Sequence, residues 1–347
     1  MLDQMENAGL QGLHFAQDRA TGLRAIIAIH STARGPAIGG CRFLHYDSEE
    51  AAITDAVRLA RGMSYKAALA GLPHGGGKAV LIEPEQPYDR VALMEAFGRV
   101  VEGLGGQYIT AMDSGTNVSD MDAIAHTSRW VSCTRDSGDP SPWTALGVFE
   151  GIKAALRQRF GSDELDGCHI SLQGLGHVGY AVAGHLAGAG ARLTVSDINP
   201  QPLARACEEF AAHSVAPEQI YSVNADLFCP CGLGAILNDH SIDRLKVAIV
   251  AGSANNQLLE ERHGDLLHQR GILYAPDYVI NAGGLIFVAL QHAGKSQQQI
   301  RQAVLKIGDS LQALFEEARQ ADQPTHLIAN RRAERIIAEA KRYCPAA

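Results

Sequence analysis

Three glycines in the segment HISLQGLGHVGYAV constrain the fold of this 347-residue chain more than any other feature. They form the pattern Gly174-x-Gly176-x-x-Gly179, directly after a strand-like apolar run and at the start of a helix-like segment. Glycines so placed permit a tight turn, close backbone approach to a pyrophosphate and close packing of helix on strand. The helix N-terminus offers free N–H groups and a positive dipole end to phosphates, so the segment predicts a dinucleotide-binding loop. The residues assigned to the loop are Gly174, Leu175, Gly176, His177, Val178 and Gly179.

An acidic residue after the next expected strand indicates which dinucleotide binds. Asp197 follows Gly179 by 18 residues, and a carboxylate there can accept hydrogen bonds from the ribose hydroxyls of adenosine. It would repel a 2′-phosphate, and the next residues, Ile198 and Asn199, offer no arginine to hold one. The pattern therefore favours NAD over NADP. Glycines that only tighten the packing of helix on strand would explain one of the three, but not all three together with Asp197.

The length of the sequence and the order of its expected strands and helices predict two domains. A chain of 347 residues exceeds what one hydrophobic core usually supports. The polar stretch SCTRDSGDPSP (132–142) has the composition of a linker, and strands alternate with helices after it, which predicts a doubly wound parallel sheet. Before it, residues 48–62 are expected to form a helix, because apolar residues recur on one face of that segment.

Charge and cysteine usage exclude several classes of partner. A net charge of −8 without a basic cluster argues against nucleic acid or an anionic membrane. No apolar run approaches the 18 or so residues that span a bilayer, and the polar N-terminus does not have the profile of a signal peptide. Seven scattered cysteines form no disulfide framework, and Cys229-Pro-Cys231 lacks the second pair or histidine motif of a metal site. We expect a cytoplasmic protein without a bound metal.

Two lysines in unusual surroundings are candidates for the chemistry. Lys66 and Lys78 lie in MSYKAALAGLPHGGGKAVL, whereas a lysine normally belongs on a solvated face. A phosphate-binding loop of the GxxxxGK[ST] type would need glycine and a hydroxyl residue where Leu72 and Ala79 stand. A lysine desolvated beside a second cation has a lowered pKa and can act as a general base. Asp113, at the end of an expected strand, is by itself as typical of a turn or helix cap as of a catalyst.

Taken together, the motifs resemble the glutamate/leucine/phenylalanine/valine dehydrogenase family, and most of all its leucine dehydrogenase branch. The matching segments are MSYKAALAGLPHGGGKAV, GPAIGGCR (35–42), ITAMDSGT (109–116), GLGHVG, AGSANNQL (251–258) and DYVINAGGLI (277–286). They follow one another in the family's order from about residue 12 to 330. The resemblance implies reversible NAD-dependent oxidative deamination of an apolar L-amino acid to its 2-oxo acid, ammonia and NADH, by a homo-oligomer (a dimer or larger).

The resemblance also implies an architecture. Residues 1–137 would form an α/β substrate-binding, catalytic and oligomerisation domain with a mixed sheet. Residues 138–325 would form a Rossmann domain, and a C-terminal helix in 326–347 would return to the first domain. The active site would lie in the cleft between the two domains.

The resemblance assigns roles to individual residues. Lys66 would bind the substrate carboxylate, Lys78 would be the catalytic base acting through water, and Asp113 would handle the amino-group proton. The residues placed around the substrate are Gly39, Gly40, Met63, Ile38, Leu285 and Val288, and those placed near the cofactor are Thr144, Asn255 and Asn281. Ile38 stands where glutamate-acting relatives carry a lysine, which favours an aliphatic substrate. Two departures from the family pattern, Met112 and Phe287, concern the details of the pocket.

Other functions stay open at this level. Within the family the substrate could be phenylalanine, tryptophan or valine. A non-catalytic NAD-binding sensor would be expected to have lost Lys78 or Asp113, and both are present. A hydroxy-acid dehydrogenase would need a histidine–carboxylate couple, which the sequence does not place. The roles of His74, Cys229 and Cys231 are not assigned.

Overall fold

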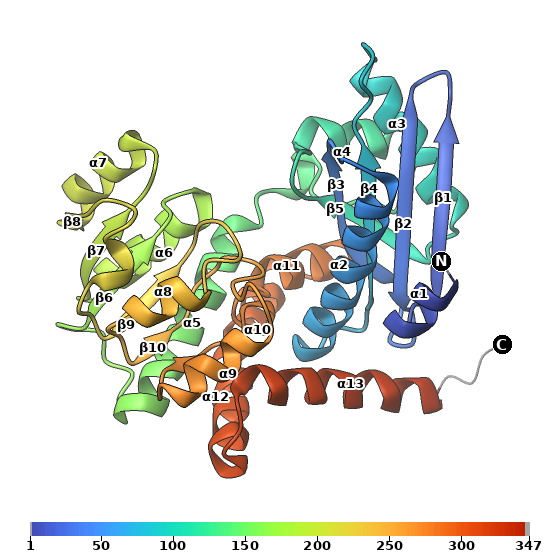
Figure 1. Ribbon diagram of the computed structural model, residues 1–347. Helices are drawn as coiled ribbons and strands as arrows, with labels where there is room; N and C mark the ends of the chain where they lie inside the picture. The colour runs from blue at the N-terminus through green and yellow to red at the C-terminus, as the bar shows by residue number, and fades with distance from the viewer. Residues whose placement is uncertain (1, 344–347) are drawn as a thin grey trace. The chain divides into compact units, whose positions relative to one another are not determined.

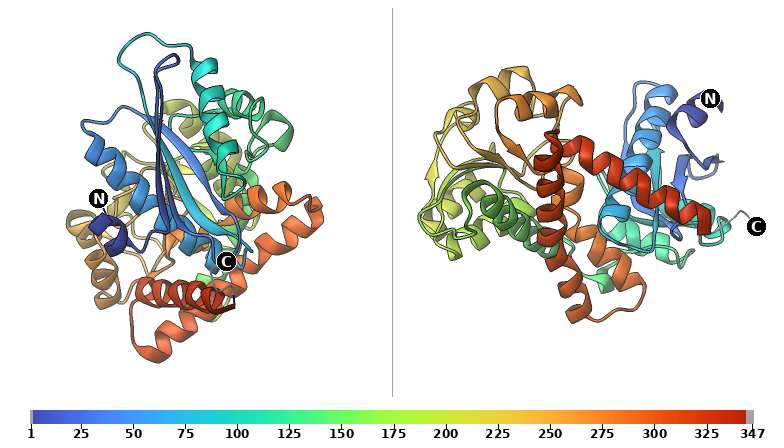
Figure 2. Two further views of the ribbon diagram at one scale, coloured as in Figure 1. Left: turned by 90° about the vertical axis from the view of Figure 1, so that its right-hand side faces the viewer. Right: turned by 90° about the horizontal axis from the view of Figure 1, so that it is seen from below.

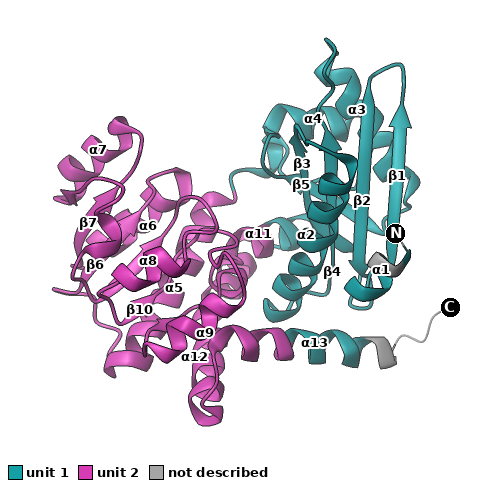
Figure 3. Cartoon of the chain, viewed as in Figure 1, with its two compact units in different colours: residues 1–139, 288–295, 333–347 teal, residues 140–287, 296–332 magenta. Residues whose placement is uncertain are grey.

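The computed structural model describes residues 2–343 and divides into two compact units (Figures 1 and 3). Unit 1 comprises residues 1–139, 288–295 and 333–347, and unit 2 comprises residues 140–287 and 296–332. The units part after residue 139, within the linker-like stretch. Residues 288–295, which the sequence analysis places in the second domain, belong to unit 1, and the last helix begins in unit 2.

Unit 1 is built on a mixed five-stranded sheet with the strand order β1-β2-β4-β3-β5. β2 is antiparallel to both β1 and β4, while β3 is parallel to β4 and β5. The strands are β1 (Gly12–Asp18), β2 (Leu23–Ser31), β3 (Ala37–Leu44), β4 (Gly75–Ile82) and β5 (Tyr108–Met112). Its helices are α1 (Leu2–Ala8), α2 (Glu49–Leu69), α3 (Arg90–Gly103) and α4 (Val118–Ala125). The expected mixed sheet is confirmed.

Helix α2 carries two of the predicted site residues, and it is longer than the sequence suggested. Ser48 caps it by accepting a hydrogen bond from the Ala51 backbone N–H, as its position before two glutamates predicts. The expected helix stopped at Gly62, but the structure continues to Leu69. The added turns pack closely on β4, because a Cβ at Gly76 would lie only 2.0 Å from the Ser64 backbone nitrogen. A glycine-rich strand therefore allows the helix to continue and to carry Lys66.

Unit 2 contains a six-stranded sheet with the order β11-β10-β9-β6-β7-β8, and every pair of neighbours in it is parallel. Its strands are β6 (His169–Gln173), β7 (Arg192–Ser196), β8 (His213–Ser214), β9 (Leu227–Pro230), β10 (Ile249–Val250) and β11 (Leu273–Tyr274). The order reverses at β6, as in doubly wound folds, where ligands bind at the carboxyl ends of the strands. This confirms the predicted fold class.

The helices of unit 2 alternate with its strands. They are α5 (Ser141–Phe160), α6 (His177–Gly188), α7 (Pro200–Phe210), α8 (Asp239–Arg244), α9 (Arg262–Gln269), α10 (Asp277–Ile280) and α12 (Gln297–Ala321). Two further helices, α11 (Gly283–His292) and α13 (Thr325–Tyr343), have residues in both units. Asp322, in the left-handed conformation at φ 48°, ends α12, and the chain turns sharply into α13 (Figure 2). No helix of residues 2–343 is both long and apolar enough to cross a bilayer.

Tyr108 joins the core of unit 1 to the glycine pair of β3. Its side chain is fully buried, and its hydroxyl donates a hydrogen bond of 2.7 Å to the Gly39 carbonyl oxygen. We predict that Tyr108→Phe lowers the free energy of unfolding by about 0.5–1.5 kcal/mol, the usual contribution of one such bond. The matched control is Tyr88→Phe, which deletes a hydroxyl from a half-buried tyrosine bonded to Glu83. Urea unfolding of both variants checks this; an equal or smaller effect at Tyr108 contradicts it.

Candidate active site and dinucleotide loop

Lys78 lies on β4, between β2 and β3, and its side chain is only 7% exposed. Its ammonium forms an ion pair with the carboxylate of Asp113, directly after the end of β5. A Cβ at Gly40 would lie 2.7 Å from the Cβ of Asp113, so any larger residue there would displace the aspartate. The two residues predicted to carry the proton chemistry are therefore in direct contact, and the second glycine of β3 leaves the space for it.

Asp113 is held by a second group of charges that sequence reasoning missed. The Arg42 Nε lies 3.4 Å from its Oδ2, and the Arg42 Nη1 lies 2.7 Å from the Asp55 Oδ2. The Tyr46 hydroxyl donates to the same Asp55 oxygen at 2.8 Å. Arg42 stands in the GGCR motif next to the glycine pair, which was the available signal. No sequence motif marks Asp55, which lies on α2, because only the folded structure brings that helix to β3.

The charges around Asp113 decide its ionisation. Burial acts to raise the pKa of its carboxyl, but the ion pair with Lys78 and the nearby Arg42 outweigh burial, and the pKa lies below its usual value. Asp113 is therefore a carboxylate at neutral pH. In that form it can accept a proton from a neighbouring ammonium or from a bound amine.

The other substrate residues of unit 1 lie on β3 and α2. Met63 approaches Gly39, where a Cβ would lie 3.4 Å from the Met63 Cγ and 1.8 Å from the Gly77 carbonyl oxygen. Lys66 follows Met63 by three residues on α2, so the two are neighbours on one helix face. Ile38 is fully buried on β3, in register with Gly76.

Leu285 and Val288 also share a helix face, because they stand three residues apart on α11. Leu285 is half-buried and belongs to unit 2, whereas Val288 is 5% exposed and belongs to unit 1. Phe287 stacks on Trp143, with ring centroids 5.6 Å apart. This stacking gives a packing reason for an aromatic residue at a position that departs from the family pattern.

The three glycines of the dinucleotide loop serve three different geometric needs. Gly174 adopts φ +94°, which favours glycine, at the turn after β6. Gly176 faces open space, since a Cβ there would have no neighbour within 4 Å. Gly179 packs against the turn, because its Cβ would lie 2.0 Å from the Gly174 carbonyl oxygen. No side chain caps α6, which begins at His177, so its first N–H groups are available to an anion.

Asp197, after β7, lies beside this loop. One of its carboxylate oxygens accepts a hydrogen bond from the Leu175 N–H at 2.5 Å, and the other accepts one from the Asn199 N–H at 2.7 Å. A carboxylate can accept about four hydrogen bonds, so capacity remains for two ribose hydroxyls. Ile198 is 89% exposed next to it and offers an apolar surface. These groups fit the adenosine end of a dinucleotide.

Unit 2 also brings together the other predicted cofactor residues. The Asn281 Nδ2 donates to the Asn255 Oδ1 at 2.8 Å and to the Ser253 carbonyl oxygen at 3.1 Å. The Asn281 Oδ1 is buried without a hydrogen-bond partner and can accept one from a ligand. A Cβ at Gly284 would lie 2.6 Å from the Thr144 Oγ1, so the NAGG segment packs on the start of α5.

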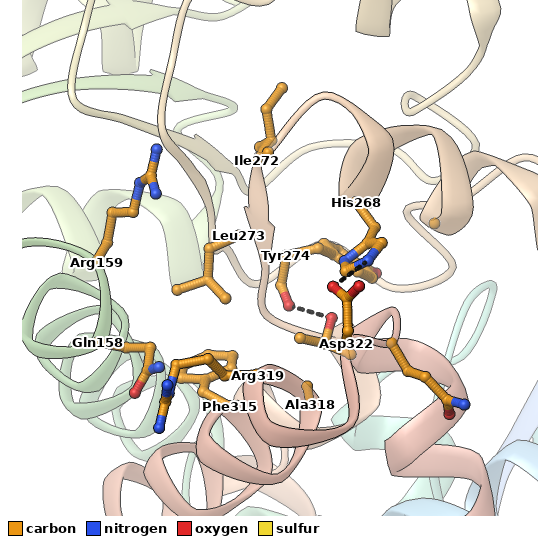
Figure 4. Close-up of a pocket in the computed structure, with 14 residues that line it drawn as sticks. Gln158, Arg159, His268, Ile272, Leu273, Tyr274, Phe315, Ala318, Arg319 and Asp322 are labelled. Atoms are coloured by element: carbon orange, nitrogen blue, oxygen red, sulfur yellow. Dashed lines mark hydrogen bonds and ion pairs between the residues drawn. The ribbon is translucent and has the colours of Figure 1, made fainter.

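A pocket elsewhere in unit 2 contains none of the predicted site residues (Figure 4). It lies among α5, α9, β11 and the end of α12, over the apolar side chains of Leu273 and Phe315. Of its polar side chains, Arg319 forms an ion pair with Glu316, and Asp322 lies 3.7 Å from His268. Among residues 2–343, no group of three histidine, cysteine or acidic side chains could hold a metal.

Comparison with known proteins identifies the class. A family model described as "Glu/Leu/Phe/Val dehydrogenase, dimerisation domain" matches residues 12–130. A second model, "Glutamate/Leucine/Phenylalanine/Valine dehydrogenase", matches residues 199–343. The chain is thus an NAD(P)-dependent amino-acid dehydrogenase. It belongs to the Glu/Leu/Phe/Val dehydrogenase family, as the motifs predicted.

Its similarity to individual members extends over the whole chain. The chain is 49% identical to a leucine dehydrogenase of Geobacillus stearothermophilus over 337 residues, covering 96% of this chain and 92% of that one. It is 44% identical to an L-tryptophan dehydrogenase of Nostoc punctiforme over 345 residues, covering 99% of this chain and 97% of the other. The crystal structure of L-tryptophan dehydrogenase from Nostoc punctiforme matches with a TM-score of 0.88 at 42% identity, covering 99% of this chain and 100% of that one.

Proposed function

We propose that this protein catalyses the reversible, NAD-dependent oxidative deamination of branched-chain L-amino acids to their 2-oxo acids. The observation that carries the proposal is the buried contact of Lys78 with Asp113, beside the glycine pair of β3. The family membership supplies the reaction class, and the 49% identity to a leucine dehydrogenase supports the substrate class. A homo-oligomer is part of the proposal, because residues 12–130 match a model described as a dimerisation domain.

The residues divide the work of the reaction between binding and proton transfer. Lys66 binds the substrate carboxylate as an ion pair. A nicotinamide cofactor bound at the loop of unit 2 would supply the acceptor for the hydride of the α-carbon, and the oxidised substrate is then an iminium. Lys78 removes a proton from a water molecule as the water oxygen bonds to that carbon. Asp113 gives a proton to the nitrogen of the resulting carbinolamine, ammonia departs, and loss of the hydroxyl proton yields the 2-oxo acid.

Contact between Lys78 and Asp113 explains how both can act in one turnover. A lysine must give up a proton before it can accept one from water, and Asp113 is the nearest carboxylate that can take it. The same carboxylate then returns that proton to the leaving nitrogen. Groups of this kind contribute typically about 10²–10⁴-fold each to the rate.

The proposed roles of the two lysines predict different kinetic defects. Lys78→Ala should lower kcat by roughly 10²–10⁴-fold while NADH still binds, because it removes a group needed for proton transfer. Lys66→Ala should chiefly raise the KM for the amino acid, because it removes a charge pair made in the ground state as well. Lys306→Ala, at an exposed position of α12, is the control. A near-normal kcat for Lys78→Ala refutes the assignment of the base.

The side chains assigned to the pocket favour aliphatic substrates. Ile38, Leu285 and Val288 carry nothing that could neutralise a buried carboxylate, which costs several kcal/mol when unpaired. They favour apolar side chains by about 0.8 kcal/mol per buried methylene. We predict that leucine, valine and isoleucine give the highest initial rates of NAD reduction among the twenty L-amino acids, and that NADH oxidation by their oxo acids requires ammonia. Glutamate turnover comparable to leucine would overturn the pocket assignment.

A second candidate is an aromatic substrate. It is favoured by the similarity to the L-tryptophan dehydrogenase of Nostoc punctiforme. The same panel of amino acids decides between the two. One methylene separates rates by about 10–200-fold, so phenylalanine or tryptophan rates about tenfold or more above leucine would indicate an aromatic pocket. That result would leave the proposed reaction unchanged and would change the proposed substrate class from branched-chain to aromatic amino acids.

The position of Asp197 predicts a preference for NAD over NADP. Its carboxylate, held beside the loop by the Leu175 N–H, would repel a 2′-phosphate. Asp197→Ser should therefore narrow the gap between the kcat/KM values for the two cofactors. Asp243→Ser, at an exposed position of α8, should leave the gap unchanged. If the kcat/KM of the unaltered protein for NADP equals or exceeds that for NAD, the assignment is wrong.

A further inference from the structure

Two cysteines lie side by side next to the dinucleotide loop and have no part in the reaction. Cys229 lies on β9, and Cys231 follows Pro230, the last residue of that strand. Their sulfur atoms are 3.6 Å apart. Cys229 is fully buried, while Cys231 is partly exposed. The described part of the chain gives this pair no third ligand for a metal, so its chemistry is that of a dithiol.

The backbone of Cys231 is packed directly against the loop. Its N–H donates to the Gln173 carbonyl oxygen at 2.7 Å, at the end of β6. A Cβ at Gly174 would lie 2.8 Å from the Cys231 carbonyl carbon, and a Cβ at Gly179 would lie 2.9 Å from the Cys231 Cβ. No side chain fits between Cys231 and either glycine. A shift of this cysteine must therefore move the first and third glycines of the loop.

We propose that Cys229 and Cys231 form a reversible disulfide whose closure lowers the affinity of the neighbouring loop for the dinucleotide. The inference rests on the proposed function in one respect, namely that this loop binds NAD. It makes Cys229-Pro-Cys231 a redox-sensitive modification site, with a small-molecule disulfide such as oxidised glutathione as the oxidant.

The burial of the two residues sets the order of the chemistry. Cys231, the less buried residue, attacks one sulfur of the oxidant as a thiolate, forms a mixed disulfide and releases one thiol. Cys229 then attacks the Cys231 sulfur, forms the S229–S231 bond and releases the second thiol. The protein loses two protons and two electrons, and the oxidant gains both pairs as it becomes two thiols. Its contact with Cys229 and hydrogen bonds from Ser253 lower the pKa of Cys231, despite burial, which assists the first step.

Closure of this disulfide has to strain the strand end. The sulfurs must approach from 3.6 Å to about 2.05 Å. Alternate residues of an extended strand have Cα atoms about 6.7 Å apart, near the upper limit of about 6.8 Å for a disulfide. The backbone at Pro230 and Cys231 must contract, although the Pro230 carbonyl already accepts the Ala254 N–H at 2.9 Å. A strained disulfide is readily reduced, which makes the modification reversible.

The test is a titration of the full-length protein with oxidised glutathione. Mass spectrometry should find the loss of two hydrogens within the peptide that holds Cys229 and Cys231. NADH binding, followed by its fluorescence, should weaken by about tenfold in the oxidised form, as for the loss of one hydrogen bond to a charged phosphate. Dithiothreitol should restore both the mass and the affinity. NADH binding to the reduced protein, measured first, tests the cofactor proposal separately.

Variants separate the disulfide from other effects of oxidation. Cys231→Ala keeps the Cβ that packs on the loop, so it should bind NADH normally. It should also keep its affinity in oxidised glutathione, because the attacking thiol is lost. Cys207→Ala, at a half-buried position of α7, should behave like the unaltered protein. The proposal is overturned if no Cys229–Cys231 bond forms, or if it forms without a change in NADH affinity. It is equally overturned if Cys231→Ala loses affinity in oxidised glutathione as much as the unaltered protein does.

Discussion

The ion pair between Lys78 and Asp113 is the interaction on which the architecture of unit 1 depends. Removing one partner of a buried ion pair is costly, because the other charge is then left without compensation. The surroundings accordingly supply two further charges, Arg42 on β3 and Asp55 on α2, and a hydrogen bond to Asp55 from Tyr46. Since the folded state lowers the pKa of Asp113, its contribution to stability is present above about pH 3.9 and is lost as the pH falls through the folded-state value.

The glycines of β3 and β4 follow from the same constraint. Gly40 leaves room for Asp113, Gly76 lets α2 approach the sheet, and Gly77 leaves room for the ring of Tyr108. Strands so rich in glycine are poor at forming a sheet by propensity alone. These strands are stabilised by neighbouring groups that pack into the space left by the missing side chains. As a result, Lys78 is buried in unit 1 with its ammonium paired to a carboxylate.

The sequence predicted those features that depend on local pattern. The glycine spacing at 174–179, with Asp197 after the next strand, was enough for the parallel sheet. The same spacing predicts the cofactor loop, and the setting of Lys78 predicts the strand that we propose to be catalytic. It could not predict features that depend on distant elements. Asp55 reaches Arg42 only because α2 packs on β3, and the end of α2 depends on Gly76, which follows it in the chain. A second cation was the expected neighbour of a basic lysine, whereas the direct partner of Lys78 is a carboxylate.

The central claim is that Lys78 acts on Asp113 directly, and the most direct test is the pKa of Asp113 with and without that lysine. The carboxyl carbons of the aspartates can be labelled with carbon-13 and titrated by NMR, with Asp113→Asn to assign the signal. In the unaltered protein the pKa of Asp113 should lie below the ordinary aspartate value of about 3.9. In Lys78→Met the value should rise, because burial then acts without its main counterweight. A signal that titrates at the same pH in both proteins would contradict the claim.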